Sequence, residues 1–301
     1  MGLTEEHDAF RAMVRAYVEN EIDPHIDEWE AAEMMPLHQI FSDMAKLGML
    51  GLEYEPEYGG QGAGHLYTVI LAEEFGRCGN GSLPMALGVQ VDMATPSLAR
   101  FGTPEQKRTY LAPALAGDRV ASITVSEPDA GSDVASIRTR ARRDGDEWVI
   151  NGSKTWITNA VQADWLCLLA RTSDEGGYAG MSQIIVPTSA PGFSVSKKLD
   201  KLGMRASDTA LLSFDDCRVP VANTIGETPK QVKISTKFVE VSQENTDELG
   251  FDWIVTPFNL NAGNTIFGSG GTVGSGVGRT NADFISPVAG AVIPGIPVAQ
   301  N

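Results

Sequence analysis

Apolar residues near the start of the chain recur at the spacing of an α-helix. One stripe comprises Phe10, Met13, Val14, Tyr17 and Val18. Residues three and four positions apart share one face of a helix, so this stripe predicts an amphipathic helix that packs against a core. Thr4 stands just before it as a candidate N-cap. The pattern predicts a helical lead domain over residues 1–118.

Further helices are predicted in the same region from periodicity and helix-end signals. They span residues 37–47, 68–77, 89–101 and 104–116. Pro36 lies near the first turn of the first of these, and Gly48 ends it. Thr103 is a cap for the last, and residues 57–62 read as a loop.

At about Val120 the period of the pattern changes from 3.6 to 2. β-Branched and aromatic residues dominate segments 148–150, 156–158, 183–186 and 211–214. Turn signals separate them at Asp144-Gly145, Asn151-Gly152, residues 175–177 and Pro191-Gly192. We therefore expect an α+β multidomain fold in which a small antiparallel β-barrel domain, residues 119–227, follows the all-α domain. A hairpin is predicted around Asn151-Gly152.

The character of the chain changes again between residues 226 and 229. Residues 232–241 alternate like a strand, and the chain from Pro257 onward is rich in Gly, Asn, Ser and Pro with little charge. We expect a strand-containing, Gly-rich tail. Within it, residues 261–301 are expected to be loose or disordered, because such sequence offers little apolar surface to offset chain entropy.

The composition and charge of the chain exclude several classes of function. The net charge of −16 leaves no basic face for a nucleic acid or an anionic membrane, and no membrane is expected for residues 1–227. Three widely spaced cysteines read as small buried hydrophobes in a reducing compartment. The four histidines form no metal-binding pattern, so no metal site is predicted. The acidic N-terminus shows no secretory or transit signal, which favours a cytoplasmic location.

Two segments carry candidate chemistry. Residues 125–133 read VSEPDAGSD, and residues 151–159 read NGSKTWITN. A flavin needs a dry face for its rings, hydrogen-bond donors at its polar edge, and glycines where the backbone comes close. The residues that offer these elements are Val125, Ser126, Gly131, Ser132, Trp156 and Thr158.

The same segments resemble the flavin-site signature of the acyl-CoA dehydrogenase family, with Thr124 where a smaller residue is usual. Three supporting stretches occur in the family's order: EPEYGG at 55–60, FGTPEQK at 101–107 and KLGMRASDT at 201–209. The resemblance covers residues 1–227. It implies an N-terminal helical domain, a middle domain that binds FAD and coenzyme A, and a role in fatty acid metabolism.

The resemblance also implies roles for single residues at the flavin. Ser126 would bond the pyrimidine edge, Thr158 would reach N5, and Trp156 would pack beside the isoalloxazine. Ile123 and Val125 would contribute backbone or packing contacts.

Substrate contacts are implied in the same way. Ser132 would lie close to the pantetheine arm and phosphates of an acyl-CoA thioester, and Gly131 would permit the approach. Asp129 and Asp133 could suggest a two-carboxylate or metal site, but acids on a turn usually cap it, and we reject that interpretation. Arg205 fits a structural ion pair or a subunit contact better than a ligand clamp, so it is left out of the site.

Family members remove a proton and a hydride from the acyl chain, which gives an α,β-unsaturated thioester, and an electron-transfer flavoprotein accepts the electrons. The proton is taken by a glutamate of a third, helical domain, and the intact family forms homo-oligomers. Here the family's pattern stops at about residue 227. Nothing aligns Glu240, Glu244 or Glu248 with that base. We therefore expect a truncated, weak or inactive dehydrogenase without the C-terminal helical bundle, whose catalytic base is unknown.

Residues 228–260 resemble the start of a bacterial secretin domain, in KQVKISTKFVEV at 230–241 and ELGFDW at 248–253. This resemblance suggests a chimeric chain. Two other functions stay open: a non-catalytic protein that retains flavin or coenzyme A binding, and a fragment of a secretin-type outer-membrane pore.

Overall fold

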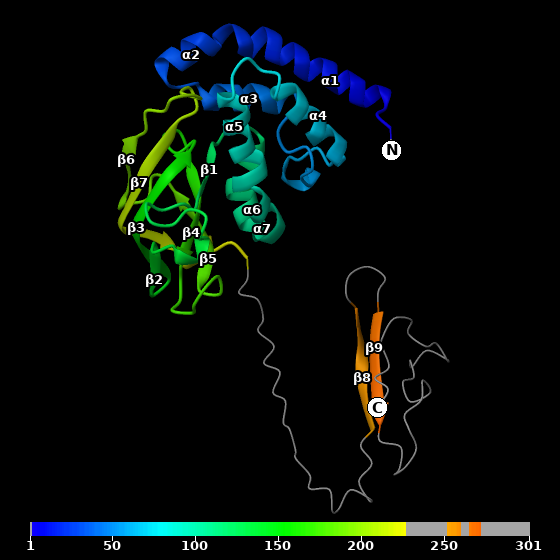
Figure 1. Cartoon of the computed structure of the whole chain (residues 1–301), viewed down its shortest axis with the longest axis vertical. Helices are drawn as coiled ribbons and strands as arrows, with labels where there is room; N and C mark the ends of the chain where they lie inside the picture. Colours follow the sequence, from blue (N-terminus) through cyan, green and yellow to red (C-terminus); the bar gives the residue numbers. More distant parts are fainter. Residues whose placement is uncertain (1, 227–251, 260–264, 272–301) are drawn as a thin grey trace, which may run out of the picture. The chain divides into compact units, whose positions relative to one another are not determined.

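The computed structural model describes residues 2–226, 252–259 and 265–271. The chain divides into two compact units, Met1–Pro229 and Lys230–Asn301. The first unit consists of a group of helices packed along one side of a curled sheet (Figure 1). In the second unit, strands β8 (Asp252–Asn259) and β9 (Thr265–Gly271) form an antiparallel pair.

The first part of the chain is helical. Its α-helices are α1 (Glu5–Tyr17), α2 (Ile26–Ala32), α3 (Leu37–Lys46), α4 (His65–Phe75), α5 (Ser82–Gly88), α6 (Pro96–Phe101), α7 (Pro104–Gln106) and α8 (Ala112–Leu115). π-Helical turns at Val18–Ile22, Val89–Ala94 and Lys107–Leu111 join several of them. Short 3₁₀ turns lie at Asp23–His25, Pro56–Tyr58, Val134–Ser136 and Val221–Asn223. No described helix is both long enough and apolar enough to cross a lipid bilayer.

Helix-end signals in the sequence are confirmed at two places. Thr4 occupies the N-cap of α1, and its backbone N–H donates to the ring of His7 at 3.1 Å. Thr103 caps α7 by accepting a hydrogen bond from the N–H of Gln106 at 3.2 Å. The single helix expected over residues 89–101 is instead interrupted before α6, because Pro96 has no N–H to continue the helical ladder.

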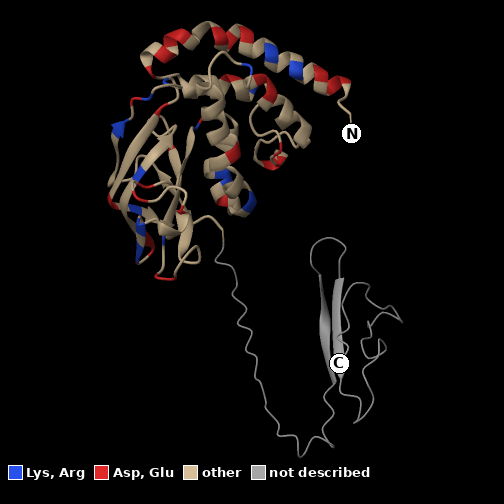
Figure 2. Ribbon diagram, in the orientation of Figure 1, with Lys and Arg blue, Asp and Glu red and all other residues tan. Residues whose placement is uncertain are grey.

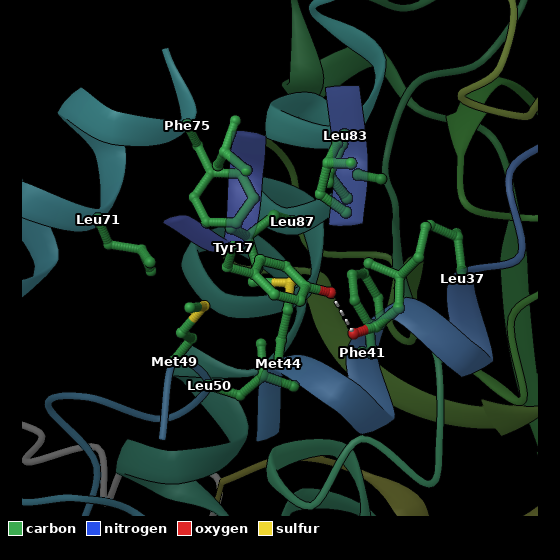
Figure 3. Close-up of a cluster of buried hydrophobic side chains, with 14 of the residues drawn as sticks. Tyr17, Leu37, Phe41, Met44, Met49, Leu50, Leu71, Phe75, Leu83 and Leu87 are labelled. Atoms are coloured by element: carbon green, nitrogen blue, oxygen red, sulfur yellow. Dashed lines mark hydrogen bonds between the residues drawn. The ribbon is translucent and has the colours of Figure 1, made fainter. Parts of the chain in front are cut away.

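The helical domain has its own hydrophobic core. Side chains from α1, α3, α4 and α5 converge there, as Figure 3 shows for Tyr17, Phe41, Met44, Phe75 and Leu83. Val14 and Tyr17 of the predicted stripe are buried, as the helical spacing requires. Burying a large apolar side chain contributes about 1.5–3 kcal/mol, so this cluster accounts for much of the domain's cohesion.

Ion pairs fasten α1 to α4. Acidic residues lie in the first turn of α1, and Arg11 and Arg15 follow them along the helix (Figure 2). Glu74 of α4 is almost fully buried beneath that helix. Its carboxylate forms an ion pair with the guanidinium group of Arg11, with an N–O distance of 2.8 Å, and a second ion pair with Arg15. Both guanidinium groups satisfy a carboxylate that would otherwise be buried without a partner.

The second part of the chain forms a seven-stranded sheet. Its strands are β1 (Ala121–Thr124), β2 (Arg140–Asp144), β3 (Glu147–Thr158), β4 (Trp165–Arg171), β5 (Met181–Pro187), β6 (Phe193–Lys198) and β7 (Thr209–Pro220). The strands lie in the order β1-β4-β2-β3-β7-β6, with β5 paired to β4. One apolar cluster fills the inside of the sheet, and another, which includes Trp165 and Leu98, joins it to the helices.

The expectation of an antiparallel barrel is wrong in its strand directions. β1 runs parallel to β4 over four residue pairs, and β2 also pairs with β4 in parallel, between Arg140 and Arg171. The sheet therefore contains both parallel and antiparallel strand pairs. Within residues 2–226 the strand pairing follows an open path, and the sheet curls without closing into a circuit. Parallel pairing needs a long crossover, and the β2–β3 hairpin supplies it between β1 and β4. Local alternation does not distinguish the two directions.

The hairpin expected at Asn151-Gly152 is also wrong. β3 runs straight through these two residues, and the turn lies earlier, at Gly145-Asp146, where Asp144 pairs with Glu147. The pairing of β3 with β7 shifts register between Ile150 and Gly152. An isolated glycine within a strand often marks a bulge or a close backbone approach rather than a chain reversal.

Asp164, just before β4, fastens the helical domain to the sheet. Its carboxylate accepts hydrogen bonds from the N–H of Val120 at 2.8 Å and from Arg119 at 2.9 Å, and it lies 2.9 Å from His38 of α3. Burial alone would raise the pKa of Asp164, but these partners outweigh burial and hold the pKa below its ordinary value of 3.8. The ionised carboxylate is therefore the form that the folded chain prefers.

Asp164→Asn is expected to lower the free energy of unfolding at pH 7 by about 1–3 kcal/mol, because hydrogen bonds to a charged group are lost. A carboxylate whose pKa is depressed by folding stabilises the fold above its unfolded pKa. The difference between wild type and variant should thus be full at pH 7 and shrink as the pH falls below about 4. Urea titrations across this range measure it. The control is Asp174→Asn, an exposed partner of Arg140, and an equal loss in both variants would contradict the assignment.

The predictions for the tail are only partly within the described residues. A strand in the tail is confirmed by β8 and β9. Residues 265–271, within the stretch expected to be loose, form β9, which pairs with β8. The strand predicted at 232–241, Glu240, Glu244 and Glu248, and the expected absence of a helical bundle all fall outside the described residues.

Candidate functional site

The end of β3 meets the segment that follows β1. The Ser122 hydroxyl donates to the carbonyl of Thr158 at 2.6 Å, and the N–H of Thr155 donates to the carbonyl of Ser126 at 2.9 Å. These bonds bring together the two segments that the sequence singled out. We call residues 125–131, which continue from β1, the 125–131 loop.

A buried ion pair lies beneath the 125–131 loop. Lys154 of β3 is fully buried, and its ammonium group lies 2.9 Å from the carboxylate of Glu127 and donates to the carbonyl of Val125 at 2.7 Å. The Glu127 carboxylate also accepts the N–H groups of Arg138 at 2.6 Å and Thr139 at 2.9 Å. The pair therefore connects β3, the loop and the approach to β2.

The environment of this pair favours the charged carboxylate. Burial would raise the pKa of Glu127, but hydrogen bonds from Thr139, the Arg138 N–H and Lys154 outweigh burial and hold the pKa below its ordinary value. Burial lowers the pKa of Lys154, and the attraction of Glu127 opposes that change. Because each ion is the other's main compensation for lost hydration, removing either one would leave an unpaired buried charge.

Trp156 has an unusual position for a large aromatic residue. Its side chain is 66% exposed, and its backbone adopts the left-handed conformation with φ at 60°. That conformation costs a residue with a side chain roughly 1–2 kcal/mol. The next residue, Ile157, is buried in the core of the sheet. The strand thus turns Trp156 outward, at a cost, beside the 125–131 loop.

Three hydroxyl groups of the predicted site are free to bind a ligand. Ser126 and Thr158 use their carbonyl oxygens in the bonds described above, and both side chains are only partly buried. Within residues 2–226 the hydroxyls of Ser126, Thr158 and Ser132 have no hydrogen-bond partner. Ser132 is exposed on the connection from β1 to β2. A Cβ atom at Gly131 would meet nothing within 4 Å, so the chain itself does not require glycine there.

Ile123 and Val125 differ in their surroundings. Ile123 packs against the cluster that joins the helices to the sheet, which fits a packing role behind the site. Val125 is tied through its carbonyl to Lys154. Neither side chain is fully buried.

These residues fit a flavin. A flavin requires an apolar surface beside its ring system and donors for its polar edge, and Trp156 and the hydroxyls of Ser126 and Thr158 supply both. The free hydroxyls lie on a framework in which the main-chain carbonyls of Ser126 and Thr158 already accept hydrogen bonds. A ligand would therefore find donors that need no rearrangement of the fold.

A separate cavity of about 560 Å³ lies in the helical domain. Tyr54, His65, Asp92 and Arg100 contribute to its lining, and none of the seven predicted site residues does. Burial, with the nearby Glu53 carboxylate, raises the pKa of Asp92. The cavity is therefore distinct from the junction of β1 and β3.

The residues excluded from the site make structural contacts. Asp129 pairs with Arg138 at 3.3 Å on the surface, and Asp133 accepts a hydrogen bond from Ser136. Arg205 pairs with Asp200 at 2.7 Å and with Glu33. Among the described residues no group of histidine, cysteine and acidic side chains is arranged to hold a metal ion.

Sequence reasoning missed both Lys154 and Glu127 as functional residues. The sequence did contain a signal for Lys154. This lysine stands between Ser153 and Thr155, in a strand segment whose neighbouring residues are apolar or small. A charged residue in such a strand is either solvated or paired. Its partner, 27 positions earlier in the chain, could not be identified from spacing.

Comparisons with known proteins support the resemblance to the acyl-CoA dehydrogenase family. Residues 4–118 match the family described as acyl-CoA dehydrogenase, N-terminal domain, and residues 122–217 match acyl-CoA dehydrogenase, middle domain. A mitochondrial isovaleryl-CoA dehydrogenase from Pongo abelii is 37% identical over 236 residues, which cover 77% of this chain and 56% of that protein.

Solved structures agree in fold. A probable acyl-CoA dehydrogenase from Mycobacterium abscessus has 40% identity and a TM-score of 0.71, and the alignment covers 74% of this chain and 59% of that one. A glutaryl-CoA dehydrogenase from Mycobacterium smegmatis, in complex with FADH2, has 32% identity and a TM-score of 0.69, over 74% of this chain and 56% of that one. The chain thus spans less than two thirds of the length of these relatives. The secretin resemblance of residues 228–260 gains no support from these matches and stays a prediction.

Proposed function

Because the chain belongs to the acyl-CoA dehydrogenase family, we propose that residues 1–226 bind FAD at the junction of β1 and β3 and serve the α,β-desaturation of an acyl-CoA thioester. The observation that carries the proposal is the pairing of Ser126 with Thr155 and of Ser122 with Thr158. It joins the two segments that carry two free hydroxyls and an exposed tryptophan. Bound FAD would accept the electrons that leave the acyl chain.

The roles of the side chains follow from their chemistry. Ser126 and Thr158 would donate hydrogen bonds to the polar edge and to N5 of the flavin, and Trp156 would cover part of the ring system and exclude water from it. Ile123 and Val125 would support this wall from behind. Gly131 and Ser132 would face the pantetheine and phosphate part of the thioester, where an exposed hydroxyl and an open glycine leave room.

The proton-abstracting residue is not assigned. Glu240, Glu244 and Glu248 lie outside the described residues, and no geometry supports a role for them. The proposed partners are those of the family: the acyl-CoA substrate, an electron-transfer flavoprotein and a second copy of the chain.

The visible spectrum of the purified chain with added FAD tests the proposal. We expect retained yellow flavin, and bleaching when an acyl-CoA series is added without oxygen. Yellow protein that no acyl-CoA bleaches would support flavin binding and contradict the dehydrogenase activity. A chain that retains no flavin would contradict the proposal as a whole.

A further inference from the structure

Hydrogen bonds from β3 fix the orientation of two successive peptide groups in the 125–131 loop. The carbonyl of Val125 accepts a hydrogen bond from the Lys154 ammonium at 2.7 Å, and the carbonyl of Ser126 accepts one from the Thr155 N–H at 2.9 Å. Both donors belong to consecutive residues of β3. The orientation of the loop is therefore set at two adjacent points.

These bonds determine where the N–H groups of the loop point. In a trans peptide the carbonyl of one residue and the N–H of the next belong to one plane and point in opposite directions. With the Val125 carbonyl held by Lys154, the N–H of Ser126 points away from the buried ammonium. With the Ser126 carbonyl held by Thr155, the N–H of Glu127 points away from β3 and donates to Ala130 at 2.8 Å. Within residues 2–226 the N–H of Ser126 has no partner.

The position of Lys154 depends on Glu127. The ammonium group has no access to water, and the Glu127 carboxylate lies 2.9 Å away and is itself held by the N–H groups of Arg138 and Thr139. Lysine has a long, flexible side chain, so only such an enclosure holds its tip at one carbonyl. A neutral residue of similar size would fill the space but would not bind the carbonyl of Val125.

We propose that the buried Lys154–Glu127 ion pair is a positioning device that presents the backbone N–H of Ser126, together with its hydroxyl, to the flavin. The inference rests on the proposed function, since it names the groups that prepare that site. Lys154 touches neither ligand nor substrate. It acts through the peptide group between Val125 and Ser126.

Lys154→Met is the first test, with Lys198→Met as the matched control. Lys198 of β6 also binds one main-chain carbonyl and one carboxylate, both of Glu33, away from the loop. Without added flavin, we expect the hydrogen-bonded amides of Glu127 and Ala130 to exchange with deuterium at least about 10-fold faster in Lys154→Met and unchanged in Lys198→Met. The FAD dissociation constant should rise about 10- to 100-fold in Lys154→Met alone.

Lys154→Met combined with Glu127→Gln separates positioning from the cost of an unpaired buried charge. The double variant removes both charges, so its melting temperature should recover relative to Lys154→Met, whereas FAD affinity should stay low because nothing holds the Val125 carbonyl. Should Lys154→Met fail to fold, the double variant carries the test. Recovery of wild-type affinity in the double variant, or unchanged exchange in either folded variant, would overturn the proposal.

The exchange measurement also separates this inference from the proposed function. If wild-type chain binds no FAD but Lys154→Met still accelerates exchange of the Glu127 and Ala130 amides, the proposed function fails and the hold of the ion pair on the loop stands. If FAD binds to the wild type and to Lys154→Met equally well, the proposed function stands and the positioning role fails.

Discussion

Trp156→Ala is expected to weaken FAD binding about 10- to 100-fold and to leave the melting temperature of the flavin-free chain unchanged. An aromatic side chain on a ring system contributes its buried area and a further 0.5–1.5 kcal/mol or so from stacking, and each 1.4 kcal/mol or so is tenfold in affinity. Stability should not change, because the indole is 66% exposed. Alanine would also adopt the same left-handed backbone at similar cost.

Trp148→Ala is the matched control, since it removes the same side chain from the same strand. Trp148 packs against the core of the sheet, and its ring N–H donates to the Thr224 hydroxyl at 2.9 Å. Its loss should lower the melting temperature and leave FAD affinity as in wild type. Fluorescence titration of FAD and thermal unfolding measure the two effects. A Trp156→Ala chain that melts early and binds FAD normally would show that Trp156 serves the fold.

Gly152→Ala is expected to destabilise the chain by about 3 kcal/mol or more, which corresponds to a melting temperature roughly 6–12 °C lower in a domain of this size. A Cβ atom there would lie 2.5 Å from the Thr139 hydroxyl and 2.8 Å from its Cα atom, and φ is 149°. The N–H of Thr139 holds the Glu127 carboxylate. Displacement of Thr139 should therefore also reduce FAD affinity.

Gly145→Ala, in the turn just before β3, provides the control. Gly145 has φ at 62°, but a Cβ atom there would meet nothing within 4 Å. Only the backbone cost of about 1–2 kcal/mol should appear. Calorimetry of both variants distinguishes the close contact from the backbone conformation, and equal losses would mean that Thr139 moves aside without cost.

The helices were predictable because their signals are local. The apolar stripe from Phe10 to Val18 and the caps Thr4 and Thr103 depend on residues within one or two turns, and the structure contains them. The helix expected over residues 89–101 failed at one residue, Pro96, whose effect on the ladder outweighs the periodicity.

The sheet was harder to predict, because pairing between distant segments leaves no local trace. The same alternation of residues fits parallel and antiparallel neighbours, so the parallel direction of β1 relative to β4 could not be predicted. Asn151-Gly152 has the composition of a tight turn, yet Gly152 is required by contact with Thr139, thirteen positions earlier.

The candidate site was predicted as a set of residues, and the structure explains how some of them meet. Resemblance pointed to Ser126 and Thr158, whereas the bonds through Ser122 and Thr155 that join their segments follow from the fold. Lys154 escaped notice because burial, which gives a charged side chain its importance, is not visible in a single sequence.

The parallel pairing of β1 with β4 has a consequence for how the chain would acquire the proposed cofactor. Ala121 pairs with Trp165, 44 positions later (165 minus 121), whereas β2 and β3 pair across a two-residue turn. Contacts between distant residues form late, because the loop between them must first be closed against entropy. During synthesis on a ribosome, the β2–β3 hairpin can therefore form before β4 is available to pair with β1. The 125–131 loop continues from β1, so under the proposed function flavin would be bound in the last steps of folding, and the supply of FAD at that moment would influence how much of the chain reaches its native state.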